Sequence, residues 1–184
     1  MFKSCAIAVV VLFLTTLSLA QVPAGNVFFG YSYLSADQNT GGRANLNGWN
    51  ASVEGKVAPL LGIVADISGY YGSQDFALVC TAPLCPPSSL SSSTHSFLFG
   101  PRLSVSVGKF RPFAHALFGA SHINGSAAGV SESDTSFAYA LGGGLDYHLV
   151  PLIAWRIQAD ALQTRFFGGT QSNARISTGI VVHF

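Results

Sequence analysis

The segment IAWRIQADA, residues 153–161, alternates strictly between two kinds of side chain. One set of alternate positions holds Ile, Trp, Ile, Ala and Ala, and the other holds Ala154, Arg156, Gln158 and Asp160. Such alternation predicts a β-strand, because successive side chains of a strand point to opposite faces of the sheet. This strand would therefore have one apolar face and one face that carries charge.

The same period-two pattern recurs along the chain, and helical spacing is not sustained in any of these windows. Eight strands are predicted, at about 26–35, 46–57, 61–72, 95–107, 111–122, 136–147, 152–164 and 173–184. Each is roughly ten to twelve residues long, whereas five or six is usual in soluble sheets. At ~3.3 Å per residue and ~45° tilt, ten residues span a ~25 Å apolar band.

The predicted connections alternate between short and long. Short turns are expected at 58–60, 108–110 and 148–151, and long polar loops at 37–45, 73–94, 123–135 and 167–172. Short periplasmic turns opposite longer outer loops are typical of transmembrane barrels.

The charges of the predicted strands decide between a membrane barrel and a soluble one. Every charged strand residue away from the rims falls on the face opposite the large apolar side chains. These residues are Glu54, Lys56, Asp66, Arg102, Asp146, Arg156, Asp160 and Arg175. A Lys or Arg on the lipid face costs about 2–4 kcal/mol at the bilayer midplane, while a soluble barrel shows the reverse arrangement. The sequence therefore predicts apolar residues outside and a charge network inside.

The expected interior is filled, because eight strands enclose little more than their own side chains. The inner charges comprise four acids and four bases, which can neutralise one another by pairing. A closed, salt-bridged barrel is the main interpretation, and a narrow pore for ions or small solutes is the alternative.

The composition agrees with a membrane-embedded chain. Of 184 residues, 49% are apolar and 9% are charged, against about 25% charged in a soluble domain. Disorder is excluded, and a net charge of +1 gives no electrostatic case for nucleic acid. Gly142-Gly143-Gly144 lies within a strand and cannot cradle a phosphate. No cofactor or metal is therefore expected.

The first twenty residues form a separate segment. Lys3 is its only charge, an apolar run follows from Cys5, and Ser18-Leu19-Ala20 offers the small-x-small pattern of a cleavage site. We interpret residues 1–20 as a cleaved export signal and 21–184 as the barrel domain; an uncleaved membrane anchor is the alternative. Beyond Ala20 no apolar run reaches the ~18 residues of a membrane helix.

Two cysteines, Cys80 and Cys85, fall in a loop rich in proline and serine. In an exported chain such a close pair predicts a small loop disulfide. A zinc site would need four ligands, and no second pair lies nearby.

Three segments carry a family resemblance: FFGYSYL at 28–34, ALGGGLDY at 140–147 and GIVVHF at 179–184. With them the chain resembles the eight-stranded outer-membrane barrels, the OmpA-like and OmpX-like group of Gram-negative bacteria. The resemblance implies an antiparallel up-and-down transmembrane β-barrel surrounded by outer-membrane lipid and lipopolysaccharide, and a monomer. It also implies that the barrel-assembly machinery reads Ile180, Val182 and Phe184 as a C-terminal signal.

Enzymatic activity is not expected. The histidines available as general bases are His95, His115, His122, His148 and His183. The His-x-Ser pair of outer-membrane lipid A deacylases does not occur, and His115 is expected to be a hydrogen-bonded interior residue.

The sequence thus predicts a structural or surface-interaction protein of the outer membrane that acts through its extracellular loops. A narrow pore, a lipid A-modifying enzyme and a soluble lipocalin-like carrier are the alternatives.

Overall fold

A computed structural model describes residues 24–38, 42–76, 88–127, 130–165 and 170–184. The expected export signal at 1–20 and the expected Cys80–Cys85 disulfide lie outside the described residues. Among the described residues, no helix is long and apolar enough to cross a membrane.

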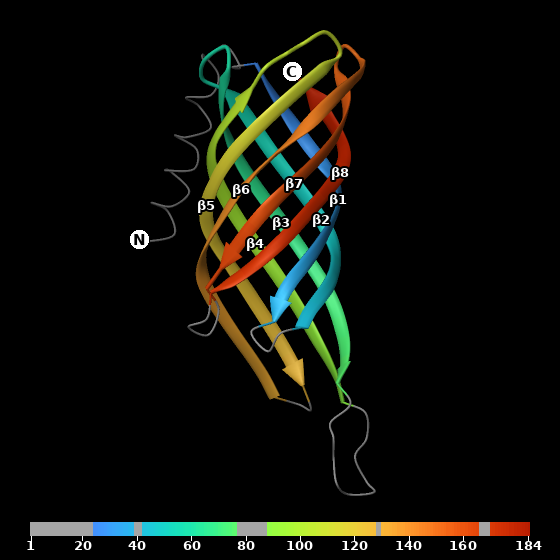
Figure 1. Cartoon of the computed structure of the whole chain (residues 1–184), viewed down its shortest axis with the longest axis vertical. Helices are drawn as coiled ribbons and strands as arrows, with labels where there is room; N and C mark the ends of the chain where they lie inside the picture. Colours follow the sequence, from blue (N-terminus) through green and yellow to red (C-terminus); the bar gives the residue numbers. More distant parts are fainter. Residues whose placement is uncertain (1–23, 39–41, 77–87, 128–129, 166–169) are drawn as a thin grey trace, which may run out of the picture.

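The chain forms a closed antiparallel β-barrel in which each strand pairs with its neighbours in sequence and β1 pairs with β8 (Figure 1). The strands are β1 Gly25–Gln38, β2 Gly42–Lys56, β3 Leu61–Phe76, β4 Ser88–Ser104, β5 Phe110–Ala127, β6 Val130–Val150, β7 Ile153–Thr164 and β8 Gln171–His183. All eight predicted strands are present, and the predicted fold class is confirmed.

Two of the predicted long loops are wrong. Residues 37–45 and 123–135 are mostly strand, since β1 and β2 are separated only by 39–41 and β5 and β6 only by 128–129. The apolar alternation stops where the strands leave the hydrocarbon, because both faces then meet water. Backbone pairing between neighbours nevertheless continues, down to the pair Ala127–Val130.

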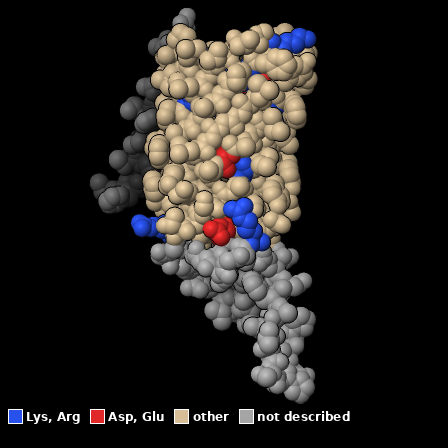
Figure 2. Space-filling model, viewed as in Figure 1, with Lys and Arg blue, Asp and Glu red and all other residues tan. Residues whose placement is uncertain are grey.

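The alternation sorts side chains between lipid and interior as predicted. Along β7, burial alternates residue by residue, so that Trp155 and Ile157 point outward while Arg156 and Gln158 are buried. The barrel wall in Figure 2 is largely free of Lys, Arg, Asp and Glu; most of those in view lie near its ends, and one acidic and basic spot lies part-way along it. The outer surface is therefore the apolar one, as hydrocarbon requires.

Four consecutive strands extend together beyond the closed barrel, and the paired ends of β1 and β2 also continue past it, as far as Gln38–Gly42. The pairing of β6 with β7 ends at Ala138–Thr164, and that of β2 with β3 ends at Asn47–Tyr71. Beyond these levels β3, β4, β5 and β6 remain paired with one another, so residues 72–76, 88–94, 122–127 and 130–137 form a four-stranded sheet. We call this sheet the outer extension; in Figure 1 it reaches below the ends of β7 and β8.

The opposite end of the barrel has tight turns. Between β4 and β5 the chain reverses at Gly108, whose φ of 61° lies in the left-handed region that glycine tolerates best. Val107 and Phe110 exchange backbone hydrogen bonds across this turn. Both described chain ends also lie here, since Gly25 and Phe184 hydrogen-bond to each other through their backbones.

Candidate functional site

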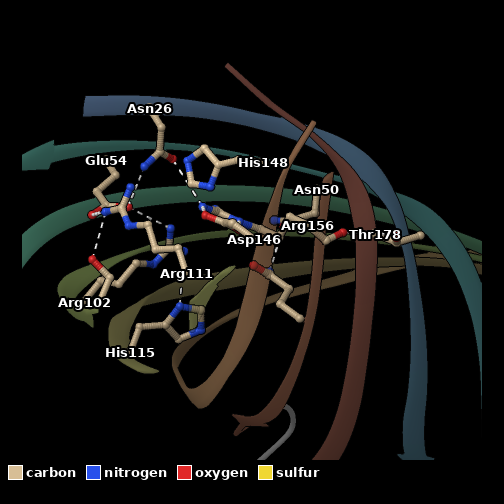
Figure 3. A network of polar contacts seen from close by, with 12 residues as sticks. Asn26, Asn50, Glu54, Arg102, Arg111, His115, Asp146, His148, Arg156 and Thr178 are labelled. Atoms are coloured by element: carbon tan, nitrogen blue, oxygen red, sulfur yellow. Dashed lines mark hydrogen bonds and ion pairs between the residues drawn. The ribbon is translucent and has the colours of Figure 1, made fainter. Parts of the chain in front are cut away.

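The barrel interior contains a network of buried ion pairs. At the short-turn end, the carboxylate of Glu54 on β2 accepts hydrogen bonds from Arg102 on β4 at 3.2 Å and from Arg111 on β5 at 3.1 Å. Asn26 on β1 donates to the same carboxylate at 2.7 Å. Figure 3 shows Asn26, Arg102 and Arg111 around Glu54. One acid thus joins four strands.

A second acid at this level is paired by a two-pronged contact. Arg156 on β7 donates from Nε and Nη2 to the two oxygens of Asp146 on β6, at 2.6 and 2.7 Å. The Arg156 guanidinium also lies over the rings of Phe28 and Phe113, 5.2 and 4.7 Å from their centroids. The planar fork and the aromatic faces hold this cation in a single orientation.

A third group lies at mid-barrel, where Arg175 on β8 bridges two carboxylates. Its Nε lies 2.7 Å from Asp160 on β7, and its Nη1 lies 2.8 Å from Asp66 on β3. Asn50 donates to Asp66 at 2.9 Å and accepts from Gln158 at 3.1 Å. Amide side chains thus provide hydrogen-bond partners for polar atoms that are not engaged in the ion pairs.

His115 connects the two levels. Its Nε2 lies 2.7 Å from Asp160, and its Nδ1 lies 3.2 Å from Nη2 of Arg102. A guanidinium nitrogen can only donate, so Nδ1 must accept and Nε2 must carry the proton. The neighbours therefore fix His115 as the neutral tautomer that donates to Asp160.

The interior charges balance, although one of the four bases differs from the one that the sequence suggested. Four buried carboxylates face four buried guanidinium groups, on Glu54, Asp66, Asp146, Asp160, Arg102, Arg111, Arg156 and Arg175. Seven of the eight predicted residues belong to this network.

The eighth predicted residue, Lys56, does not join the network. It is half-buried at the last position of β2 and makes none of the ion pairs formed by the described residues. Arg111 occupies the expected place of the fourth base. The sequence pattern puts Arg111 at a strand end, but its position two and four residues before the buried Phe113 and His115 places it on the inner face.

The outer half of the interior holds an apolar cluster among buried serine, threonine and asparagine side chains. Above the ion pairs lies a cluster of buried side chains that includes Leu34, Leu46, Tyr70, Leu98, Leu117 and Leu162. Tyr70 hydrogen-bonds to Ser32, which in turn bonds to Ser177. The outer side of the ionic network is therefore packed with apolar side chains and with hydroxyl groups that bond to one another.

The other histidines do not converge on one centre. His95 and His122 lie on the outer wall, where they contact Tyr71 and Thr135. His148 and His183 stack at the short-turn end, with ring centroids 4.9 Å apart. Within the described ranges, no group of three or more His, Cys, Asp or Glu side chains could hold a metal ion.

Comparison with known proteins assigns the family. A family model described as the outer membrane protein beta-barrel domain matches residues 6–184. The chain belongs to the outer membrane protein β-barrel domain family. It is accordingly a protein of the outer membrane. No curated protein sequence matches this barrel.

Solved structures share the fold of this outer-membrane barrel at low sequence identity. Ail of Yersinia pestis, the attachment invasion locus protein, is 16% identical with a TM-score of 0.63, over 88% of this chain and 99% of that one. Neisserial surface protein A is 13% identical with a TM-score of 0.64, over 87% and 97%. The N-terminal barrel of Pseudomonas aeruginosa OprF is 12% identical with a TM-score of 0.55, over 87% and 99%.

The C-terminal residues of this outer-membrane barrel face the lipid. Ile180, Val182 and Phe184 are each about half exposed, at 46%, 48% and 53%, and alternate with the inward Val181 and His183. They form an apolar strip at the short-turn end of β8. The assembly signal expected from the family resemblance falls on this strip, and its recognition stays a prediction.

Proposed function

We propose that this protein is a surface-interaction protein, in which the filled barrel is a rigid mount and the outer extension is the contact surface. The observation that carries the proposal is the strand register. Residues 130–137 of β6 pair with β5 but lie beyond the last β6–β7 pair, and residues 72–76 of β3 lie beyond the last β2–β3 pair.

The extension offers backbone groups to a partner. Within the described residues, its two outer strands have a strand neighbour on one side only. Unpaired N–H and C=O groups at a sheet edge accept an additional strand, with affinity from main-chain hydrogen bonds and selectivity from alternate side chains. An extended segment of another protein is therefore the kind of partner that fits.

The charge of this region argues against a polyanionic partner. The sequence has no Lys or Arg at 57–101 or at 112–155, whereas Asp75, Glu132 and Asp134 lie in the extension strands. One structure of Ail holds the heparin analogue sucrose octasulfate. Because the extension strands of this chain carry acids rather than bases, we do not carry that ligand over to it.

The interior supports a mount rather than a conduit. Its eight ionic groups form one pair and two sets of three, and a cluster of buried apolar side chains packs on their outer side. An ion entering this path would have to displace buried ion pairs, each of which is costly to break. We expect purified protein in planar bilayers to show no steady conductance, and lipid A to keep its mass when the protein is overexpressed.

Three further features complete the proposal. Residues 1–20 direct export and are removed, Cys80 and Cys85 form a disulfide between β3 and β4, and the barrel-assembly machinery reads Ile180, Val182 and Phe184. The outward direction of these last three side chains supports the signal. Mass spectrometry of the mature, non-reduced chain tests the first two features.

The central test removes the extension and keeps the barrel. Gly72 faces Ser92, and Asn124 faces Ser133. Replacing residues 73–91 and 125–132 each by Asn-Gly would therefore close both hairpins with two-residue turns. The matched control replaces only 39–41 by Asn-Gly, because Gln38 faces Gly42. Heat-modifiable gel mobility verifies that both variants fold.

Adhesion of cells that display each variant is then measured on extracellular-matrix proteins and on heparin. We expect the full chain and the control to adhere to matrix protein, the trimmed barrel to lose adhesion, and none of them to adhere to heparin. Equal adhesion by the trimmed barrel would contradict the proposal.

A further inference from the structure

The short-turn end of the barrel holds a pair of stacked histidines that takes no part in the ion pairs described above. His148 lies near the end of β6 and His183 at the end of β8, with ring centroids 4.9 Å apart. Residues that face each other in an antiparallel pair point to the same side of the sheet, and the strand partners Ala154 and Asn26 are fully buried. Both histidines therefore point inward, and Figure 3 shows His148 on the inner side of the wall with Asn26. Each is only partly buried, so solutes can reach the pair from the water at this end.

The hydrogen bond of His148 determines which of its ring nitrogens is free. Nδ1 lies 3.3 Å from the backbone oxygen of Lys109. A carbonyl oxygen can only accept, so Nδ1 carries the proton and, in the neutral ring, Nε2 keeps its lone pair. Nε2 makes no hydrogen bond to the described residues. Histidines that bind metals are held in this way, since their other ring nitrogen donates to a backbone carbonyl or a carboxylate.

His183 has two ring nitrogens without a partner. Both Nδ1 and Nε2 are buried, and neither has a hydrogen bond within the described part of the chain. Buried polar groups nearly always have a partner, and one that lacks it points to a bound water or ion. No hydrogen bond resists rotation of this ring about its Cβ–Cγ bond, and that torsion is soft in histidine. The ring can therefore turn one nitrogen toward a point shared with Nε2 of His148.

The separation of the two rings fits a shared metal ion. Zinc and similar ions bind imidazole nitrogen at about 2.0–2.1 Å with near-tetrahedral angles, which puts the centres of two ligating rings roughly 5 Å apart. The observed separation of 4.9 Å matches this spacing. A metal thus needs the rings to turn but does not need the strands to move.

We propose that His148 and His183 bind one divalent transition-metal ion, copper or zinc, at the short-turn mouth of the barrel. Two imidazoles are fewer ligands than a three-residue metal cluster provides, so water completes the coordination. Because His148 is on β6 and His183 on β8, the ion links two strands that are not neighbours in the sheet. The site lies at the opposite end of the barrel from the outer extension and does not depend on the adhesion proposed above.

The surroundings of the pair select among metals. Arg111 and Arg156 lie within electrostatic range of His183 and oppose a cation there, while Asp146 favours one. Both oxygens of Asp146 are already bonded by Arg156. Ca²⁺ and Mg²⁺ need sets of oxygen ligands, which a pair of imidazoles does not supply. The bond to imidazole must outweigh the repulsion, and Cu²⁺ forms a stronger one than Zn²⁺.

The test uses the two tryptophans of the chain as reporters, because bound Cu²⁺ quenches the fluorescence of a nearby indole. Trp155 pairs with Tyr147, which directly precedes His148. Trp49 lies at the middle of β2, far from this end. Untagged, folded, metal-free protein is prepared in detergent micelles in two single-tryptophan forms, Trp49→Phe and Trp155→Phe. CuCl₂ is added to each form, followed by ZnCl₂ or CaCl₂ as competitor.

We expect Trp155 to be quenched to saturation at one Cu²⁺ per chain and Trp49 to be quenched much less, with reversal by Zn²⁺ and not by Ca²⁺. His148→Ala and His183→Ala, each made in the Trp49→Phe form, should weaken Cu²⁺ binding more than tenfold, because even outer-shell partners of a metal contribute about 10–100-fold. His95→Ala is the matched control and should not change binding, since His95 is an exposed histidine on the outer wall.

A second readout is stability. Zn²⁺ should raise the urea midpoint of unfolding of the full chain, because a ligand that binds only the folded form stabilises it. It should not raise the midpoint of His148→Ala. Heat-modifiable gel mobility verifies that the variants fold. If one histidine variant does not fold, the other variant and the comparison of the two tryptophans decide.

Three results would overturn the proposal. The first is equal quenching of Trp49 and Trp155, which would indicate unspecific binding. The second is unchanged Cu²⁺ affinity in the folded His148 or His183 variant. The third is equal loss of affinity in His95→Ala and His148→Ala, which would place the metal on no particular pair of histidines.

Discussion

Nε2 of His115 lies 2.7 Å from Oδ1 of Asp160, and the two side chains are fully buried inside the barrel. Because Arg102 occupies the other ring nitrogen at 3.2 Å, His115 is a neutral connector between two groups of ions. It connects β5 to β4 and β7, which are not all neighbours in the sheet. The network therefore braces the barrel across its interior as well as along its wall.

We predict that His115→Ala lowers the free energy of unfolding by about 1–3 kcal/mol, because it leaves buried polar groups without a partner. Urea titration in lipid vesicles, followed by gel mobility without boiling, measures the change. His95→Ala is the control, since His95 lies on the outer wall and contacts Tyr71. A change equal to that of His95→Ala would refute the bracing role.

A second prediction compares Arg111, the fourth base found in the interior, with Lys56, the base that the sequence predicted there. Arg111→Gln should destabilise the barrel by about 3–5 kcal/mol, because it removes one of the cations that pair with Glu54. This is the usual cost of breaking a buried ion pair. Lys56→Gln should change stability by less than about 0.5 kcal/mol, as for most substitutions outside a packed network. The same urea titration applies, and equal effects of the two variants would disprove this assignment.

A third prediction concerns the space that one glycine leaves. A Cβ added to Gly142 would lie 2.1 Å from Oδ1 of Asp160 and 2.4 Å from the backbone oxygen of Ala159. We expect Gly142→Ala to cost about 1–3 kcal/mol, as overpacking does. Gly55→Ala is the matched control, because nothing lies within 4 Å of its added Cβ. Equal stability of the two variants would contradict the close approach.

A fourth prediction tests the lipid-facing wall. Ile157 is 44% exposed on the outward face of β7. Ile157→Arg should cost about 2–4 kcal/mol near the midplane, and Val107→Arg, in the turn between β4 and β5, should cost about 0–1 kcal/mol. Unfolding measured in bilayers and in detergent should differ most for Ile157→Arg. A larger cost for Val107→Arg than for Ile157→Arg would contradict the position of the bilayer midplane near Ile157.

The sequence was informative wherever a bilayer constrains it. Inside the hydrocarbon, a residue such as Ile157 must face lipid and one such as Arg156 must not, so the period-two pattern identified both strands and faces. The outer extension escaped prediction for the same reason. Around Asn124 and Ser133, both faces of the sheet meet water, so the apolar signal ends although the two residues still pair.

The interior partners were harder to predict than the faces. The alternation of side chains places both Lys56 and Glu54 on the inner face. It does not show that Lys56 lies close enough to the strand end for its ammonium group to reach water. Arg111 shows the converse, because the tilt of the strands brings a residue near the start of β5 beside Glu54. Hydrogen bonds such as Arg102–His115 depend on the stagger between strands, which a single sequence does not reveal.

The pairing of Asn26 with His183 joins the beginning of the strand series to its end. The cylinder consequently cannot be sealed until its final strand has been synthesised and delivered. Until then the margins formed by β1 and β8 are unpaired, and either could pair with a strand of a neighbouring copy. The topology itself thus leaves both margins open to mispairing until the last strand arrives.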